Sequence, residues 1–446
     1  MNLRDIAAGA NASMYHRPDF SKIKGAFYPR TEEELVDILK NAREKHYDVT
    51  AKGGGSGLSG GCTGGNVERF IVSSLKMDSI ISINLDDGFA DVQAGITPVQ
   101  LNKILAPLDM KFLVTPSSRD IATLGGMLGT DGGGNDTWAN GTMRDNTVKA
   151  RVVSYDGTIL LVDKDGVKSE NAELESELNA KGMNLNDLAS SHGTLGFVSE
   201  LRVKIKPLPK KRLLGGLAEY NDANELGHVL TTMIQEKCPI TYGEAIVEAH
   251  PDVRGNLKPP LLILEFPYDY SCDLKEITHF EPLSKTELNR MKEIRLKLPK
   301  RNPKEGVQVA LFEGYGFHGD NLLKMQEVIA EINQLLHEHD FIPFAKSGHA
   351  PSKWYLGDNT PAYGIVMHSR EIRPPNKPGR EVFLTVQAIV EKCMELGITP
   401  KPEHKWIYSD DIKKKRLEEI RDVLGRHMNP FIFEPNCASE TLASMV

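Results

Sequence analysis

Two glycine-rich stretches constrain the fold of this chain more strongly than any other feature. They run from Lys52 to Asn66 and from Leu124 to Gly141. Gly55 to Gly60 matches the G-x-G-x-x-G pattern of Rossmann folds, but that pattern needs a helix to begin inside it, and the following residues are too rich in glycine to propagate one. Taken alone, the first stretch fits a flexible surface loop as well as a loop of bare N–H groups that wraps an anion. Because the second stretch repeats the same chemistry, the pair predicts one large phosphate-bearing ligand.

Capping signals and hydrophobic periodicity predict helices and strands around these stretches. Thr31 to Glu34 form a capping box at the start of one helix, and Thr97-Pro98 begins another. Strands are predicted at 47–51, 69–73, 89–94 and 197–206, with Asp156-Gly157 as the turn of a hairpin. Pro207 and Pro209 end the last of these strands, so we place the first domain boundary at residue 206.

Helices and strands also interleave in the rest of the chain, which predicts a second α+β or α/β domain. Strands are expected at 261–266, 307–312 and 363–368, and a helix with one apolar face at Leu322 to His339. Two helices, at about 380–396 and 411–427, close the chain. We expect three units, at 1–206, 207–400 and 401–446.

Length and composition exclude several classes of protein. A chain of 446 residues exceeds the size at which single cores stop growing, roughly 250 to 300 residues, so it should form more than one domain. The longest apolar runs fall far short of the roughly 20 residues of a membrane-spanning helix, and the N-terminus lacks a signal-peptide core. The net charge of -7 and the absence of long basic runs speak against nucleic-acid binding. The five scattered cysteines indicate neither a disulfide framework nor an iron–sulfur cluster, so a cytoplasmic protein is expected.

Three motifs stand out, at Lys52 to Gly60, Pro116 to Gly134 and Ser191 to Val198. Together they resemble the FAD-binding domain of the vanillyl-alcohol oxidase/p-cresol methylhydroxylase (PCMH) superfamily, in the branch that includes D-lactate dehydrogenase and the flavin subunit of glycolate oxidase. Lys52 to Gly60 is similar to the branch's R-G-G-G-T-S-L-S-G. Pro116 to Gly134 is similar to P-S-S-x-x-x-T-I-G-G followed by T-N-A-G-G, with Asp131-Gly132 where Asn-Ala is usual. Ser191 to Val198 is similar to S-E-G-T-L-G-I-V, with His192 where glutamate is usual. The three occur in the family's order and spacing over 25–206.

The resemblance implies an α+β fold with a two-subdomain PCMH-type FAD-binding domain, an α+β substrate (cap) domain with an antiparallel sheet, and a C-terminal helical segment that returns to the flavin. It also implies FAD as cofactor, held noncovalently unless Cys62 forms a covalent link. Glycine would be needed in the loops because a Cβ would hold the chain away from the diphosphate. The residues expected to bind FAD are Lys52, Gly53, Gly54, Gly55, Ser56, Gly57, Leu58, Pro116, Ser117, Thr123, Gly125, Gly126, Thr130, Gly132, Gly193 and Val198.

The C-terminal half resembles the branch only in fragments. In 2-hydroxy-acid dehydrogenases of this branch, a G-H-x-G-D-G-N-x-H loop and a later E-H-G segment supply two histidines and a glutamate to a divalent metal. Here the resemblance implies His349 and Glu403 as ligands of Zn, Fe or Mn, and His404 as the base that takes the hydroxyl proton. The second histidine of the loop is missing from its usual place, and His368 is the nearest substitute as the third ligand. Arg295 resembles the arginine that holds the substrate carboxylate. His318, in a sequence that resembles the loop but precedes the helix, is the alternative to the histidines of the loop.

The resemblance implies an FAD-dependent dehydrogenase that oxidises a D-2-hydroxy acid of the D-lactate or glycolate class. No Rossmann or iron–sulfur motif is visible, so a quinone, a cytochrome or a partner subunit is expected as electron acceptor instead of NAD. Peripheral contact with the inner face of the cell membrane is compatible with such an acceptor. Two alternatives remain: a non-redox synthase of the alkylglycerone-phosphate type, which shares the flavin domain, and a flavin-binding subunit without its own catalysis.

Overall fold

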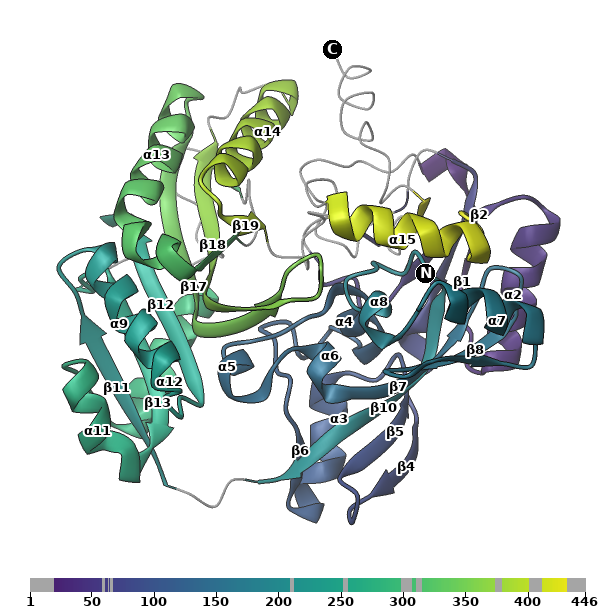
Figure 1. The fold of residues 1–446 in the computed structure, drawn as a ribbon, viewed down its shortest axis with the longest axis horizontal. Coiled ribbons are helices and arrows are strands. Elements are labelled where there is room, and N and C mark those ends of the chain that lie inside the picture. The colour runs from purple at the N-terminus through teal and green to yellow at the C-terminus, as the bar shows by residue number, and fades with distance from the viewer. Residues whose placement is uncertain are drawn as a thin grey trace.

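The structure is a computed structural model. It describes residues 20–430, apart from 58–60, 63, 65–66, 209–211, 252–255, 298–306, 310–314, 374–378 and 401–410. The described residues form an N-terminal part up to residue 208, a middle part from 212 to 400, and a C-terminal helix that packs on the N-terminal part (Figure 1).

A small parallel sheet begins the N-terminal part. Its strands, in the order β1-β3-β2, are β1 (Ile23–Phe27), β3 (Arg69–Ser73) and β2 (Asp48–Lys52). Helix α2 (Glu32–Glu44) covers the sheet with Leu35 and Leu39, which are fully buried in a cluster with Val49 and Phe70. The first glycine-rich stretch begins at the carboxyl end of β2, and β2 therefore sets the direction in which this stretch leaves the sheet.

A larger antiparallel sheet forms the rest of the N-terminal part. The described strands run in the order β4-β5-β10-β7-β8-β9, with β6 paired to β10. Their bounds are β4 (Ile80–Asn84), β5 (Phe89–Gln93), β6 (Met110–Phe112), β7 (Thr147–Val153), β8 (Ile159–Asp163), β9 (Gly166–Ser169) and β10 (Phe197–Pro207). The helices around it are α3 (Pro98–Leu105), α4 (Leu124–Thr130), α5 (Thr137–Asn140), α6 (Met143–Asn146), α7 (Ala172–Ala180) and α8 (Leu185–Leu188).

The middle part is built on one antiparallel sheet. The described strands run β14-β11-β13-β12-β17-β18-β16-β19, with β15 paired to β18. They are β11 (Leu213–Glu219), β12 (Tyr242–Ala249), β13 (Leu261–Pro267), β14 (Glu281–Leu283), β15 (Val307–Val309), β16 (Tyr315–His318), β17 (Ile342–Tyr355), β18 (Pro361–Arg373) and β19 (Thr399–Pro400). One core packs helices α9 (Ala223–Gln235), α11 (Ser271–Ile277), α13 (Met325–Glu338) and α14 (Gly379–Glu395) against the sheet, while α12 (Lys285–Lys297) belongs to a separate cluster with Ile246 and Ile263. The expected α+β class, with an antiparallel sheet in the second half of the chain, is confirmed.

Helix α15 (Asp411–Leu424) lies beside α7 and α8 of the N-terminal part, although it follows the middle part in sequence (Figure 1). Leu417 and Ile420 are fully buried in the core of the larger N-terminal sheet. The Arg416 guanidinium makes a bidentate ion pair with Asp187 at 2.9 and 2.8 Å. The C-terminal helix is thus part of the N-terminal core.

Three local predictions need correction. The second glycine-rich stretch is not one loop, because α4 forms across Gly125, Gly126 and Gly129, where buried Leu124, Met127 and Leu128 outweigh the low helix propensity of glycine. At α2, Thr31 caps the Glu34 N–H as expected, but Glu34 accepts from the Arg30 N–H and not from Thr31. The helix expected from Leu322 begins as a 3-10 turn and becomes α-helical only at Met325.

Candidate active site

A cavity of about 910 Å³ lies between the glycine-rich segments and one face of β17 and β18. All three segments that carry the family resemblance line it. The predicted cofactor-binding residues among its lining are Lys52, Gly53, Gly54, Gly55, Ser56, Gly57, Pro116, Ser117, Thr123, Gly125, Gly126, Thr130, Gly132, Gly193 and Val198. Leu58 lies outside the described residues.

The first and second loops contact each other directly, and this contact explains two of the glycines. A Cβ at Gly54 would lie 1.7 Å from the Ile121 carbonyl oxygen, and a Cβ at Gly53 would lie 2.4 Å from the Thr123 hydroxyl oxygen. The expected reason for glycine here, close approach to an anion, is therefore incomplete. At these two positions the loops themselves leave no room for a side chain.

Gly57 behaves differently, because it is exposed and lines the cavity. A Cβ there would meet no described atom within 4 Å apart from its chain neighbours. This part of the first loop therefore presents bare backbone to the cavity, which is the surface that a diphosphate needs. The cavity and its uncovered backbone fit an FAD molecule.

Lys52 places a cation at the root of the first loop. Its side chain is 5% exposed, and burial lowers the pKa of its ammonium group, while the neighbouring Cys62 acts in the opposite direction. A phosphate in the cavity would favour the charged form of Lys52. Cys62, the predicted alternative anchor for a covalent flavin, also lines the cavity.

The third segment, Ser191 to Val198, forms another wall of the cavity. His192 and Gly193 both have left-handed backbone, with φ of 53° and 72°. The His192 N–H donates to the Gly129 carbonyl of α4 at 2.7 Å. His192 is 6% exposed, so the residue that departs from the family pattern is built into the wall.

Two strands of the middle part line another side of the cavity. Ala345, Ser347 and His349 on β17, and His368 and Arg370 on β18, line it. They alternate along their strands, and Ser347 pairs with His368 while Ala345 pairs with Arg370, so all five side chains share one face of the sheet. The His349 and His368 rings lie 5.4 Å apart between centroids, and the guanidinium of Arg370 adds a permanent positive charge.

A buried carboxylate supports His349 from the neighbouring strand. Glu244 on β12 is fully buried, and its Oε2 lies 3.7 Å from His349 Nδ1. The same oxygen accepts a hydrogen bond from the side chain of Asn135, which lies in the second glycine-rich stretch. Glu244, Asn135 and Arg370 were not predicted; alternation on the strand that carries His368 would have pointed to Arg370, whereas the approach of Glu244 depends on strand pairing.

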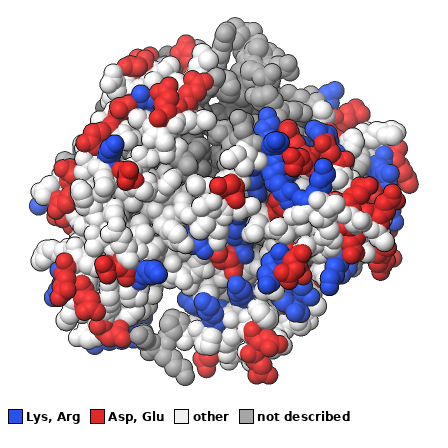
Figure 2. Space-filling view, viewed as in Figure 1, with Lys and Arg blue, Asp and Glu red and all other residues white. Residues whose placement is uncertain are grey.

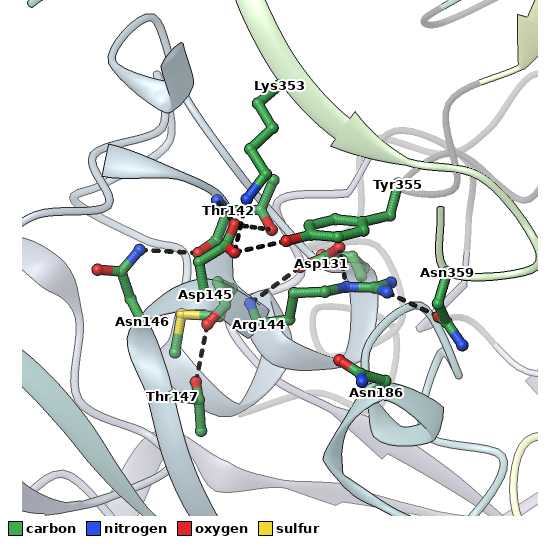
Figure 3. Close-up of polar contacts among 12 residues, drawn as sticks. Asp131, Thr142, Arg144, Asp145, Asn146, Thr147, Asn186, Lys353, Tyr355 and Asn359 are labelled. Carbon is green, nitrogen blue, oxygen red and sulfur yellow. Dashed lines mark hydrogen bonds and ion pairs between the residues drawn. The ribbon is translucent and has the colours of Figure 1, made fainter. Parts of the chain in front are cut away.

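The tip of the β17–β18 hairpin docks on the N-terminal part through a polar cluster (Figure 3). Arg144 makes an ion pair of 2.6 Å with Asp131 and donates to Asn359 at 2.7 Å. Asp145 accepts from Lys353 at 2.8 Å and from Tyr355 at 2.5 Å. Burial raises the pKa of Asp145, but these hydrogen bonds outweigh it and leave the pKa below its usual value. The cluster attaches β17 and β18 to the N-terminal part, and Arg144 pairs with the Asp131 that stands where the family has asparagine.

The predicted catalytic and metal residues are only partly brought together. Glu403 and His404 lie outside the described residues, as does the side chain of Arg295 on α12. His349 and His368 face the cavity, but among the described residues no three His, Cys, Asp or Glu side chains are placed to hold a metal ion. His318, the alternative histidine, does not line the cavity. The described residues therefore fit FAD, and they do not by themselves make a metal site.

Comparison with known proteins agrees with this geometry. The family model described as an FAD binding domain matches residues 23–163. D-lactate dehydrogenase of Archaeoglobus fulgidus is 32% identical over 180 residues, which cover 40% of this chain and 38% of that protein. D-2-hydroxyglutarate dehydrogenase of Escherichia coli (strain K12) is 29% identical over 235 residues, which cover 42% of this chain and 23% of that protein.

Residues 23–163 thus match an FAD binding domain, and the chain is similar to PCMH-type FAD-linked oxidases. FAD is its cofactor, and the glycine-rich cavity is where the described residues fit it. A solved structure of alkyldihydroxyacetonephosphate synthase shares the fold, with a TM-score of 0.64 and 16% identity, over 91% of this chain and 75% of that one. The match spans well under half the length of these two dehydrogenases. In its described part, no helix has the length and apolar character required to cross a bilayer.

Proposed function

We propose that this FAD-linked oxidase dehydrogenates a D-2-hydroxy acid of the D-lactate or glycolate class to the 2-oxo acid. Related proteins named D-lactate and D-2-hydroxyglutarate dehydrogenase support the reaction class. The single observation that carries the proposal is the cavity itself, because it joins the glycine-rich loops to a strand face with two histidines and an arginine. When bound, FAD supplies a two-electron acceptor for the hydrogen on the substrate's hydroxyl carbon.

The described side chains suit the remaining tasks. Arg370 can hold a carboxylate through two parallel N–H donors of its guanidinium group. His349 and His368 can orient the hydroxyl group, and Glu244 keeps the His349 ring in place. Hydrogen bonds of the β17–β18 hairpin with Arg144 and Asp145 hold these strands against the N-terminal part.

The residues implied by the family resemblance complete this proposal. His404 would take the hydroxyl proton, and Glu403 would join His349 and His368 if a metal binds. Arg295, on α12, is the alternative to Arg370 as the residue that binds the carboxylate. Helix α12 packs on the face of the sheet that carries Glu244, since Ile246, which belongs to the α12 cluster, lies two residues from Glu244 on the same strand.

Anaerobic bleaching of the flavin tests the function. We expect a D-2-hydroxy acid to bleach the flavin absorbance and its L-enantiomer to leave it unchanged. Absence of bleaching by a panel of D- and L-2-hydroxy acids would refute the proposal and favour a non-redox synthase or a flavin-binding subunit.

Substitution of Arg370 tests the carboxylate site. Arg370→Gln should raise the acid concentration needed for half-maximal bleaching about 10- to 150-fold, since a charge-assisted pair contributes about 1.5–3 kcal/mol. Arg212→Gln is the matched control, because Arg212 belongs to the same part but stacks on Tyr268, with its guanidinium carbon 4.5 Å from the ring centroid. If Arg370→Gln leaves the acid concentration for half-maximal bleaching unchanged, Arg295 is the better candidate for binding the carboxylate.

We further propose an acceptor other than NAD, such as a quinone, a cytochrome or a partner subunit, and a cytoplasmic location or one at the inner face of the cell membrane.

Lys and Arg side chains gather over α15, whereas Asp and Glu side chains are frequent on the outer rims (Figure 2). An acidic acceptor or an anionic surface would be attracted to that region, so the rate of electron transfer should fall as the salt concentration rises. A rate independent of salt would argue against this docking site.

A further inference from the structure

The segment after α15 inserts an asparagine behind the walls of the FAD cavity. Asn429 is 1% exposed and has a left-handed backbone, with φ of 43°. The Val49 N–H donates to the His427 carbonyl at 2.9 Å, and the Asn429 N–H donates to the Val49 carbonyl at 2.8 Å. These bonds attach the segment to the edge of β2, the strand that leads into the first glycine-rich loop.

The Asn429 side chain joins two walls of the cavity. Its Oδ1 accepts from the Ala51 N–H at 2.8 Å, and its Nδ2 donates to the His192 carbonyl at 2.6 Å. Ala51 and His192 both line the cavity, whereas Asn429 lies behind them. One amide group therefore connects the root of the first loop to the third segment.

The connection continues to the second loop. The His192 N–H donates to Gly129 of α4, so the bonds run from β2 through Asn429 and His192 to α4. Packing at this point is tight, because a Cβ at Gly193 would lie 2.9 Å from Asn429 Nδ2 and 3.3 Å from the Ala51 Cβ. Asn429 thus bonds two cavity walls directly and is linked to the third through His192.

We infer that Asn429 is a positioning residue that sets the affinity for FAD, because it holds the first glycine-rich loop at Ala51 and the third segment at His192 at a fixed separation. This inference rests on the assignment of the cavity to FAD. A ligand that must contact several walls binds more weakly when only a fraction of the free protein has those walls in place, because the apparent Kd is the intrinsic Kd divided by that fraction. The C-terminal segment would then act on the cofactor without touching it.

Asn429→Asp tests the inference with the least change in shape. The variant keeps an oxygen for the Ala51 N–H but places an oxygen against the His192 carbonyl, so one wall loses its donor. We expect the Kd for FAD, measured by fluorescence titration of the apoprotein, to rise by about tenfold or more. The rate of FAD release should rise with it.

Asn102→Asp is the matched control. Asn102 Oδ1 accepts from the Phe112 N–H at 2.7 Å, and its Nδ2 donates to the Phe112 carbonyl at 3.2 Å, so it makes the same pair of bonds between α3 and β6 outside the cavity lining. This variant should lower the melting temperature and leave the Kd for FAD unchanged. Equal changes in Kd for both variants, or an unchanged Kd for Asn429→Asp, would overturn the inference.

Hydrogen exchange provides a measurement that does not depend on a folded variant. FAD should slow exchange of the Ala51 amide, which is bonded to Asn429, more than that of the Phe112 amide, which is bonded to Asn102, because coupling between sites is reciprocal. Equal slowing of the two amides would overturn the inference. Wild-type protein that takes up no FAD would instead overturn the cofactor assignment, and with it this inference.

Discussion

Gly57 and Gly54 lie three residues apart in the first loop, yet the structure predicts opposite effects of the same substitution. Gly57→Ala places a methyl group where no described atom lies within 4 Å apart from its chain neighbours, and its backbone is not left-handed. The apoprotein should therefore be unchanged or slightly more stable, by about 0.4–1 kcal/mol, because alanine restricts the unfolded chain. The methyl group points into space that FAD is expected to fill, so the cost should appear only on binding.

The expected loss of affinity follows from packing. An extra methyl group in a well-packed contact costs about 1–3 kcal/mol, which corresponds to about a 5- to 150-fold higher Kd. Gly54→Ala is different, because its Cβ would lie 1.7 Å from the Ile121 oxygen, where about 3.3 Å is normal. The two loops would have to separate by about 1.5 Å, so this variant should lose stability without FAD as well.

Two measurements separate these outcomes: the free energy of unfolding of each apoprotein by denaturant titration, and the Kd for FAD by fluorescence. An unchanged Kd in Gly57→Ala would show that FAD does not approach the exposed part of the first loop. An unchanged stability in Gly54→Ala would refute the direct contact between the two loops.

Two further predictions concern stability. Arg144→Met should lower the free energy of unfolding by about 3–5 kcal/mol, because it leaves the buried Asp131 carboxylate without its cation; adding Asp131→Asn should recover most of the loss in denaturant titrations, and failure to recover it would refute this account. Burial lowers the pKa of His318 below 6.5, so the folded state binds this proton less readily than the unfolded state, and stability should fall as the pH drops below about 6.5. The free energy of unfolding of the wild type, relative to that of His318→Phe, should therefore decrease as the pH falls from 7.5 to 5.5. An increase would contradict the assigned burial.

Local sequence signals predicted most of the secondary structure near the site. Thr97-Pro98 begins α3 with a capping box to Gln100, and the alternation from Phe197 predicts β10 almost to the residue. These signals work because caps, turns and periodicity depend on neighbours in the chain. They failed at α4, where packing of Leu124 and Leu128 in the core forms a helix across three glycines.

The loop motifs and their resemblance identified the cofactor, because uncovered backbone amides and glycine at particular positions are written directly in the sequence. The partners of the site were decided by tertiary structure. Glu244 approaches His349 only through the pairing of β12 with β17, and Asn429 reaches Ala51 across 378 positions of the chain. A chemical group's identity is a property of the sequence, but its neighbours depend on strand register and on where distant segments pack, and no local pattern encodes those distances.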